Sequence, residues 1–156
     1  MKIVNARSDL GPMTEAEVDS FLESKLNVQL ATVDEMGDPN IQPLWFYYDK
    51  SNKKVYVTTG KTTKKVQNIR RNPAKIYFSI DDETPPMKGV KGKARITIFE
   101  DPQKIVPIAE KIYLKYLGTL DHPDAKRLIQ YTRNGDTVML EINPKFFSAW
   151  DLGKAQ

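Results

Sequence analysis

The sequence has no cysteine and only one histidine, His122, among its 156 residues. Without cysteine it has no disulfide, no thiolate chemistry and no cysteine-based zinc site. A single histidine also excludes metal sites built from several histidines. No Ser-His-Asp arrangement and no carboxylate pair with convincing spacing is present. We therefore expect no metal centre and name no catalytic residue.

Long apolar runs are also missing. No stretch approaches the length that spans a membrane, and the N-terminal segment 1–5 lacks the apolar core of a signal peptide. We therefore expect a cytoplasmic location and no membrane partner. Hydrophobic residues make up 40% of the chain and charged residues 28%, as in globular proteins. The length and the lack of a linker or repeat predict one domain over residues 1–156.

The net charge of +4 is modest, but lysine and arginine gather in residues 50–71 and 88–95. Such clusters are typical of a solvated surface or of a surface that attracts an anionic ligand. None of the standard nucleic-acid recognition motifs is present, so we expect no nucleic-acid partner.

A possible phosphate site follows the apolar run that ends at Thr59. Gly60-Lys61-Thr62 matches the end of the nucleotide-triphosphate loop, but that motif requires glycine at position 55, where Val55 stands. An ATP or GTP site is therefore not expected. The hydroxyl-rich turn still opens into a basic helix over 63–71. Its free N–H groups, threonine hydroxyls and lysines suit the phosphate of another ligand.

Capping and periodicity locate the other elements. Thr14 and Glu17 form a capping box that begins a helix over 14–25, and Pro102 begins a second helix that runs to about residue 116. A shorter helix is expected over 121–131. Strands are expected at 28–33, 41–48, 54–59, 75–80, 89–99, 137–142 and 145–150. Within the long strand, Gly92 is the place for a bulge.

Because the strands follow one another at hairpin spacing, the sequence predicts a mainly β fold. We expect a six- to seven-stranded antiparallel sheet that closes into a small barrel, with peripheral helices outside it.

The order and spacing of several segments resemble the pyridoxamine-phosphate-oxidase-like flavoprotein superfamily over residues 14–151. The segments are Leu30–Asp34, Gly37–Pro39, Pro43–Phe46, Val57–Thr59, Thr63–Val66, Asn68–Pro73, Val90–Ala94, Glu141–Pro144 and Trp150–Asp151. The resemblance implies a split β-barrel of the FMN-binding type. It also implies a homodimer that holds the flavin at the subunit interface.

The resemblance further implies which residues bind the cofactor. The family's phosphate-binding triplet corresponds to Thr63, Lys64 and Lys65, and Lys61 lies in the same turn as a further candidate. The end of the preceding strand corresponds to Thr58 and Thr59. The strand that contacts the flavin ring corresponds to Gln42, Pro43, Leu44 and Trp45. Taken alone, Trp45 could be a core residue and the lysines a solvated helix face.

Two departures from the family narrow the expected activity. Pyridoxamine-phosphate oxidases carry a C-terminal tail with substrate-binding arginine and histidine, and no histidine follows His122 here. In addition, Lys64 stands where the triplet has arginine, so bidentate phosphate geometry is lost. Our main hypothesis is an FMN-binding oxidoreductase that acts on a small-molecule substrate of unknown identity. The alternatives are a reductase that depends on the deazaflavin coenzyme F-420 and a non-catalytic flavin or haem carrier.

Overall fold

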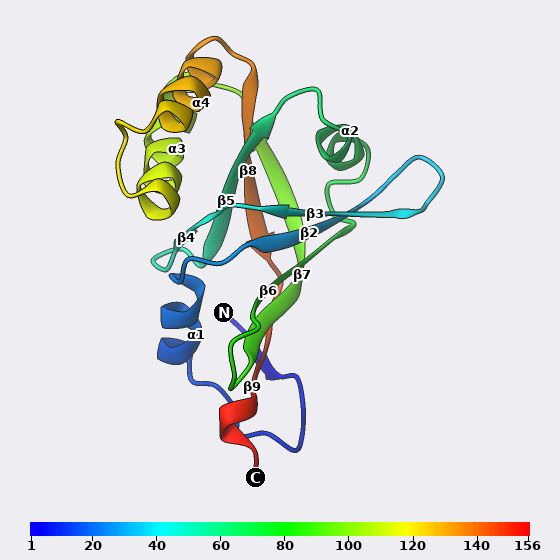
Figure 1. Cartoon of the computed structure of the whole chain (residues 1–156). Helices are drawn as coiled ribbons and strands as arrows, with labels where there is room; N and C mark the ends of the chain where they lie inside the picture. Colours follow the sequence, from blue (N-terminus) through cyan, green and yellow to red (C-terminus); the bar gives the residue numbers. More distant parts are fainter.

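The computed structural model describes residues 1–156 and contains one nine-stranded sheet with four α-helices (Figure 1). The strands are β1 (Ile3–Asn5), β2 (Val28–Val33), β3 (Pro39–Leu44), β4 (Tyr47–Asp49), β5 (Lys54–Gly60), β6 (Ile76–Asp82), β7 (Lys88–Phe99), β8 (Thr137–Pro144) and β9 (Phe147–Asp151). The helices are α1 (Glu15–Leu22), α2 (Lys64–Arg71), α3 (Pro102–Leu117) and α4 (Pro123–Arg133), followed by the short 3-10 helix η1 (Leu152–Lys154).

The strand order explains the curvature of the sheet. The strands run in the order β3-β2-β6-β7-β8-β5-β4, and β9 pairs with β7 and with β1. Strands β3 and β4 therefore lie at opposite ends of this order, although only Trp45 and Phe46 separate them in the chain. The sheet must curl for such a short connection to span it. The result is a barrel that stays unclosed between β3 and β4, which confirms the expected split β-barrel.

Three details differ from the sequence prediction. The expected strand over 41–48 is two strands, interrupted at Trp45 and Phe46 where the chain crosses between sheet edges. The short strand β1 was not expected, and its partner β9 runs parallel to it. These two differences raise the number of strands from six or seven to nine. Finally, no bulge occurs at Gly92, because the β6–β7 register continues regularly through the Phe78–Gly92 pair.

Alternating side chains build the core. In β2 every second residue is buried, and β7 alternates in the same way over most of its length. The apolar side chains among them join one cluster of 23 buried residues inside the barrel. Helices α3 and α4 form a separate small cluster with Ala109, Ile112, Tyr113, Tyr116, Ala125 and Ile129.

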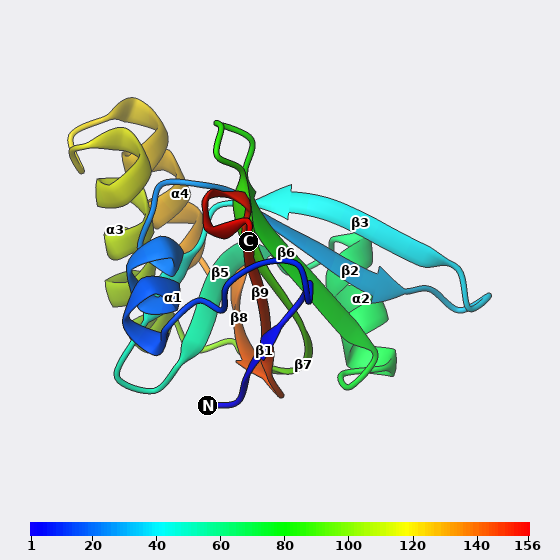
Figure 2. The same cartoon turned by 90° about the horizontal axis from the view of Figure 1, so that it is seen from below.

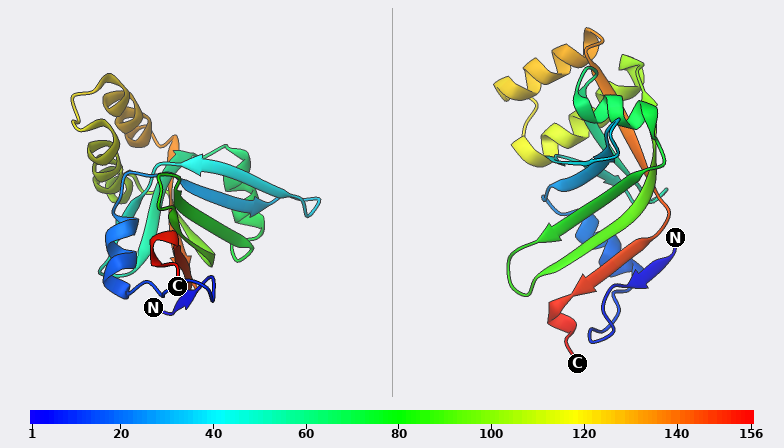
Figure 3. Two further views of the ribbon diagram at one scale, coloured as in Figure 1. Left: turned by 60° about the horizontal axis from the view of Figure 1, so that its bottom comes forward. Right: turned by 90° about the vertical axis from the view of Figure 1, so that its right-hand side faces the viewer.

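The helices lie at different places around the sheet. Figures 1 and 2 show α2 beside the projecting β2–β3 hairpin, and α3 and α4 on the other side of β5 and β8. The two views in Figure 3 show the N-terminal strand β1 beside β9, near the C-terminus. As the sequence predicts, Thr14 and Glu17 form the capping box of α1. No helix has both the length and the apolar character needed to cross a membrane.

The close approach of another backbone segment explains why position 92 is a glycine. A Cβ atom at this position would lie 2.2 Å from the carbonyl oxygen of Phe146. Since backbone cannot move aside as a flexible side chain can, we expect Gly92→Ala to lower the free energy of unfolding by about 1–3 kcal/mol. Urea unfolding measures this change. In Gly60→Ala, the control, the nearest contact of the new Cβ is an ordinary 3.4 Å. Equal losses in the two variants would contradict this explanation.

Candidate functional site

The first turn of α2 is open to an anion. Thr63 is the N-cap residue, but its side chain caps no backbone N–H of the helix; instead its Oγ1 donates to the carbonyl oxygen of Gly60 at 3.0 Å. The N–H groups of the first turn therefore lack the side-chain acceptor that usually stabilises a helix start. The positive end of the helix dipole lies at the same place.

Lys65 is a buried cation with no carboxylate beside it. The residue is only 3% exposed, and its Nζ donates to Oε1 of Gln42 at 3.1 Å. Burial lowers the pKa of Lys65 below its ordinary value. Because no salt bridge neutralises this ammonium, its charge is available to an anion that reaches the start of α2.

The neighbouring lysines point elsewhere. Nζ of Lys64 lies 2.7 Å from Oε2 of Glu35 in the β2–β3 turn, and both side chains are about half exposed. Nζ of Lys61 lies 3.9 Å from Asp136, and the Lys61 N–H donates to the Asp136 carbonyl at the start of β8. The structure therefore brings Thr63, Lys65 and Gln42 together, while Lys61 and Lys64 face carboxylates of other segments.

Strand β3 presents the other predicted residues along an edge of the sheet. Gln42 and Pro43 are exposed, and Leu44 packs against the main core. Proline at position 43 is tolerated because an edge strand needs no outward N–H. Trp45 follows the strand and is 38% exposed, so it is not a core residue. On β5, Thr58 and Thr59 are half-buried and pair with β8.

Helix α3 connects these two groups, which the sequence analysis did not foresee. The ring of Tyr116 stacks on Trp45 with a centroid separation of 4.8 Å and an interplanar angle of 5°. One turn earlier, the Tyr113 hydroxyl lies 3.5 Å from Oγ1 of Thr58. Burial raises the pKa of Tyr116 to about 12 and also raises that of Tyr113. The helical spacing of the two tyrosines was a signal for burial, but not for the strands that they contact.

Asn68 is a second feature that sequence reasoning missed. Its side chain is fully buried on α2 and donates through Nδ2 to Oγ1 of Thr32 on β2 at 3.1 Å. The Oδ1 atom of Asn68 has no hydrogen-bond partner. The Asn68–Thr32 bond fixes the rotation of α2 against β2, and this rotation directs Lys65, one turn earlier, to the inner side.

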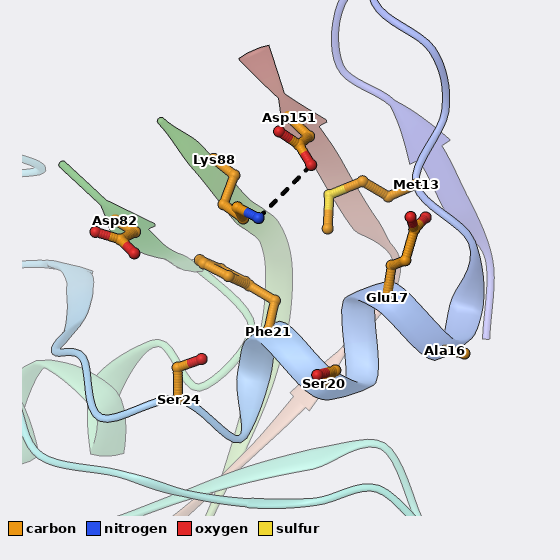
Figure 4. A pocket seen from close by; sticks show the side chains of 9 residues that line it. All are labelled: Met13, Ala16, Glu17, Ser20, Phe21, Ser24, Asp82, Lys88 and Asp151. Atoms are coloured by element: carbon orange, nitrogen blue, oxygen red, sulfur yellow. Dashed lines mark ion pairs between the residues drawn. The ribbon is translucent and has the colours of Figure 1, made fainter. Parts of the chain in front are cut away.

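Two cavities lie near the barrel but away from the start of α2. One, of about 590 Å³, is lined in part by Trp45, Tyr116 and Gln29 and includes none of Thr63, Lys64 and Lys65. The other, of about 410 Å³, is shown in Figure 4 between α1 and the ends of β7 and β9. Among its charged lining residues, Lys88 and Asp151 pair with each other, and Glu17 pairs with a lysine outside the lining.

In the cavity of Figure 4, Nζ of Lys88 lies 3.7 Å from Asp151. Glu17 also binds the Nζ of Lys154, a residue outside the lining, at 2.7 Å. Together with the N–H of Thr14, Lys154 lowers the pKa of Glu17 to about 2. His122 likewise has a structural role, since its Nδ1 accepts from the N–H of Asp124 at the start of α4. We assign neither feature to the candidate site.

The fold and the α2 site together define a split β-barrel protein with a buried lysine beside an uncapped helix start. The family model described as pyridoxamine 5'-phosphate oxidase matches residues 14–151, and the chain belongs to this family. No curated protein matches the chain by sequence.

Solved structures share this fold. A conserved hypothetical protein, Rv2991, from Mycobacterium tuberculosis is similar over 97% of this chain and 92% of its own, with a TM-score of 0.79 and 23% identity. An F-420 reductase is 30% identical over 83% of this chain and 94% of its own, with a TM-score of 0.62. A FAD-binding protein from Mesorhizobium loti is 18% identical over 88% of this chain and 94% of its own, with a TM-score of 0.63.

Burial of an unneutralised ammonium should destabilise the free protein. We expect Lys65→Met, which keeps the apolar stem, to raise the free energy of unfolding by about 1 kcal/mol at pH 7 without ligand. The pKa of Lys65 is lower in the folded chain than its ordinary value of 10.5. Between these two values the folded chain has lost the proton that the unfolded chain still holds, so the wild type should gain stability as the pH rises through this range. Urea unfolding across this range measures both effects.

The matched control for this experiment is Lys64→Met. Its ammonium is half exposed, so the change in stability should stay within about 0.5 kcal/mol. A Lys65→Met variant that is less stable than the wild type at pH 7 would contradict the prediction.

Proposed function

We propose that the protein binds FMN, with the cofactor phosphate at the start of α2, and acts as an oxidoreductase on a small-molecule substrate. The buried Lys65 ammonium carries this proposal, since it has a single amide oxygen as partner and no carboxylate. The uncapped first turn of α2 adds backbone donors beside it. A phosphate would supply the missing negative charge and the missing acceptors.

The residues of β3 and β5 fit the ring of the same cofactor. One face of the Trp45 indole stacks on Tyr116, and the side chain is still partly exposed, so its other face can receive a planar ring. The Gln42 amide oxygen accepts from Lys65, so strand β3 connects the start of α2 to the segment that leads to Trp45. When bound, a flavin supplies hydride or electron transfer itself, so the protein needs to bind, orient and shield it. Such a protein does not require a catalytic nucleophile or acid–base pair of its own.

A phosphate-specific role of Lys65 predicts a particular change in ligand preference. The wild type should bind FMN about tenfold to a hundredfold more tightly than riboflavin, which lacks the phosphate. In Lys65→Met this preference should largely disappear, while the affinity for riboflavin should change little. Fluorescence titration of both ligands measures the two affinities.

Lys126→Met, an exposed lysine on α4, is the matched control and should keep the preference. A wild type that binds neither ligand would refute flavin binding. A preference for FMN that survives in Lys65→Met would locate the phosphate elsewhere.

The deazaflavin coenzyme F-420 is a second candidate cofactor. The specific support is the 30% identity with an F-420 reductase over most of both chains. The exposed lysines also suit the anionic tail of that coenzyme. Parallel titration of FMN and coenzyme F-420 decides between them, and the tighter ligand should then support reduction of an added electron acceptor.

We also propose that the protein is a homodimer with the cofactor at the subunit interface. An exposed apolar row crosses the outer face of the sheet, because Ala31 on β2 pairs with Ile41 on β3 and with Tyr77 on β6. Ile41 is 65% exposed and Tyr77 47%. Ile41 adjoins Gln42 on this edge strand, so a second copy that buries the row would reach the sheet edge along which the candidate cofactor residues lie.

Ile41→Asp should therefore dissociate the dimer, because a carboxylate would be buried in an apolar contact. Light scattering after size-exclusion chromatography should give a dimer mass for the wild type and a monomer mass for the variant. Leu114→Asp changes a residue of similar type that is exposed on α3, outside the row, and should stay dimeric. A monomeric wild type would refute the dimer.

A further inference from the structure

The two residues between β3 and β4 belong to no strand, and side chains of α3 bind the backbone of the second, Phe46. Phe46 is fully buried, so its N–H and carbonyl both need partners. The N–H donates to the Tyr116 hydroxyl at 3.3 Å, and the carbonyl accepts from Nζ of Lys115 at 3.1 Å. The Tyr116 hydroxyl in turn donates to the carbonyl of Leu26. Two adjacent side chains of α3 therefore satisfy both backbone polar groups of one buried residue.

The charge of Lys115 is held without a carboxylate. Its Nζ lies 3.7 Å from the centroid of the Phe46 ring and 5.1 Å from that of Tyr116. No carboxylate lies within ion-pair distance of this ammonium. Cation–π attraction and a charge-assisted hydrogen bond to the Phe46 carbonyl are thus its direct interactions.

These contacts determine how Trp45 is presented. Its ring is held by stacking on Tyr116, and Tyr116 is itself fixed through its hydroxyl to Phe46 and Leu26. Lys115 binds the residue directly after Trp45 and contacts the same Tyr116 ring. The orientation of Trp45 therefore depends on α3 and on no strand ladder.

We propose that Lys115 and Tyr116 are positioning residues that hold Trp45 in the orientation that receives the flavin ring, and that loss of the Lys115 proton loosens this hold. The effect on ligand binding rests on the flavin function proposed above. The hold on Trp45 does not, because it can be measured in the free protein.

The titration of Lys115 falls in an accessible pH range. Burial lowers the pKa of Lys115 to about 8, while Glu23 acts in the opposite direction. The other charged or titratable groups around the cavity of about 550 Å³ beside Lys115 are Glu23, Tyr47, Tyr48, Asp49, Lys50 and Lys111. Burial raises the pKa of Tyr116 to about 12, so that phenol keeps its proton near pH 8.

The direction of the effect follows from the contacts. Below pH 8 the charged amine keeps its cation–π contact and its charge-assisted bond. Above pH 8 the neutral amine loses the cation–π contact and keeps at most an ordinary hydrogen bond. The hold on Trp45 should therefore weaken as the pH rises through about 8.

The first experiment measures the hold without any ligand. In a Trp150→Phe background, Trp45 is the only tryptophan, and its emission and acrylamide quenching are followed from pH 6 to 9.5. We expect quenching to increase with a midpoint near pH 8. Lys115→Arg, which stays charged, should abolish the transition and keep the low-pH signal. Lys115→Met should give the high-pH signal throughout.

Lys111→Met is the matched control for the fluorescence experiment. Lys111 lies one turn earlier on α3, and its Nζ is 4.8 Å from the centroid of the Tyr47 ring, so it does not touch Phe46. This variant should keep the transition. The absence of a transition in the parent protein, or its loss in Lys111→Met, would overturn the hold on Trp45.

The second experiment measures FMN affinity at pH 7 and pH 9. Lys115→Met should weaken binding by about fivefold to tenfold at pH 7, the size expected for a partly desolvated cation–π contact. The wild type should bind FMN less tightly at pH 9 than at pH 7, and Lys111→Met should behave in the same way. Lys115→Arg, which stays charged, should bind FMN equally well at both pH values.

Equal affinities of the wild type and Lys115→Met would overturn the positioning role. A wild type that binds neither FMN nor coenzyme F-420 would refute the proposed function, and the link to the ring with it. The fluorescence experiment would then still decide whether Lys115 holds Trp45.

Discussion

The short passage from β3 to β4 is the constraint on which the rest of the structure depends. These strands stand at opposite ends of the sheet order, and only Trp45 and Phe46 connect them. The sheet therefore has to curl into a split barrel. The same passage removes two residues from the strand ladders, so the buried Phe46 backbone must find partners elsewhere. Helix α3 supplies them, which explains why this helix lies against the barrel here and why Trp45 stays partly exposed.

The candidate site combines two regions that are stabilised by different interactions. At the start of α2 a buried cation meets one amide oxygen, and the cost of its desolvation is offset only in part. Beside Trp45, aromatic stacking and a cation–π contact build a rigid surface. The first region suits a charged group and the second a planar ring. Gln42 lies on the edge strand β3 and Trp45 follows the end of that strand, so the proposed ligand is one that has both parts.

Several elements could be predicted from sequence because their signals act over a few residues. The Thr14–Glu17 capping box, the helix that begins at Pro102 and the strand over 28–33 all appear as expected. The aromatic run over 41–48 reads as one strand because nothing local marks the crossing at Trp45. Strand β1 is short and has no periodicity of its own; only pairing with β9 creates it. Gly92 suggested a bulge in the strand. The structure instead explains the glycine by the close approach of the Phe146 carbonyl, which is distant in sequence.

The sequence by itself determined an antiparallel barrel and the order of its elements, because caps and periodicity are local properties, and the family resemblance added the split barrel and the segments proposed for the site. Only the tertiary structure decided the roles of individual side chains. Lys64 and Lys65 are neighbours, yet one faces solvent and Glu35 while the other is buried beside Gln42. Successive residues on a helix point about 100° apart, so the hairpin against which α2 packs selects the lysine that is buried. The contacts of Lys115 and Tyr116 with Phe46 likewise arise from tertiary packing, because α3 lies against a segment some seventy residues earlier in the chain.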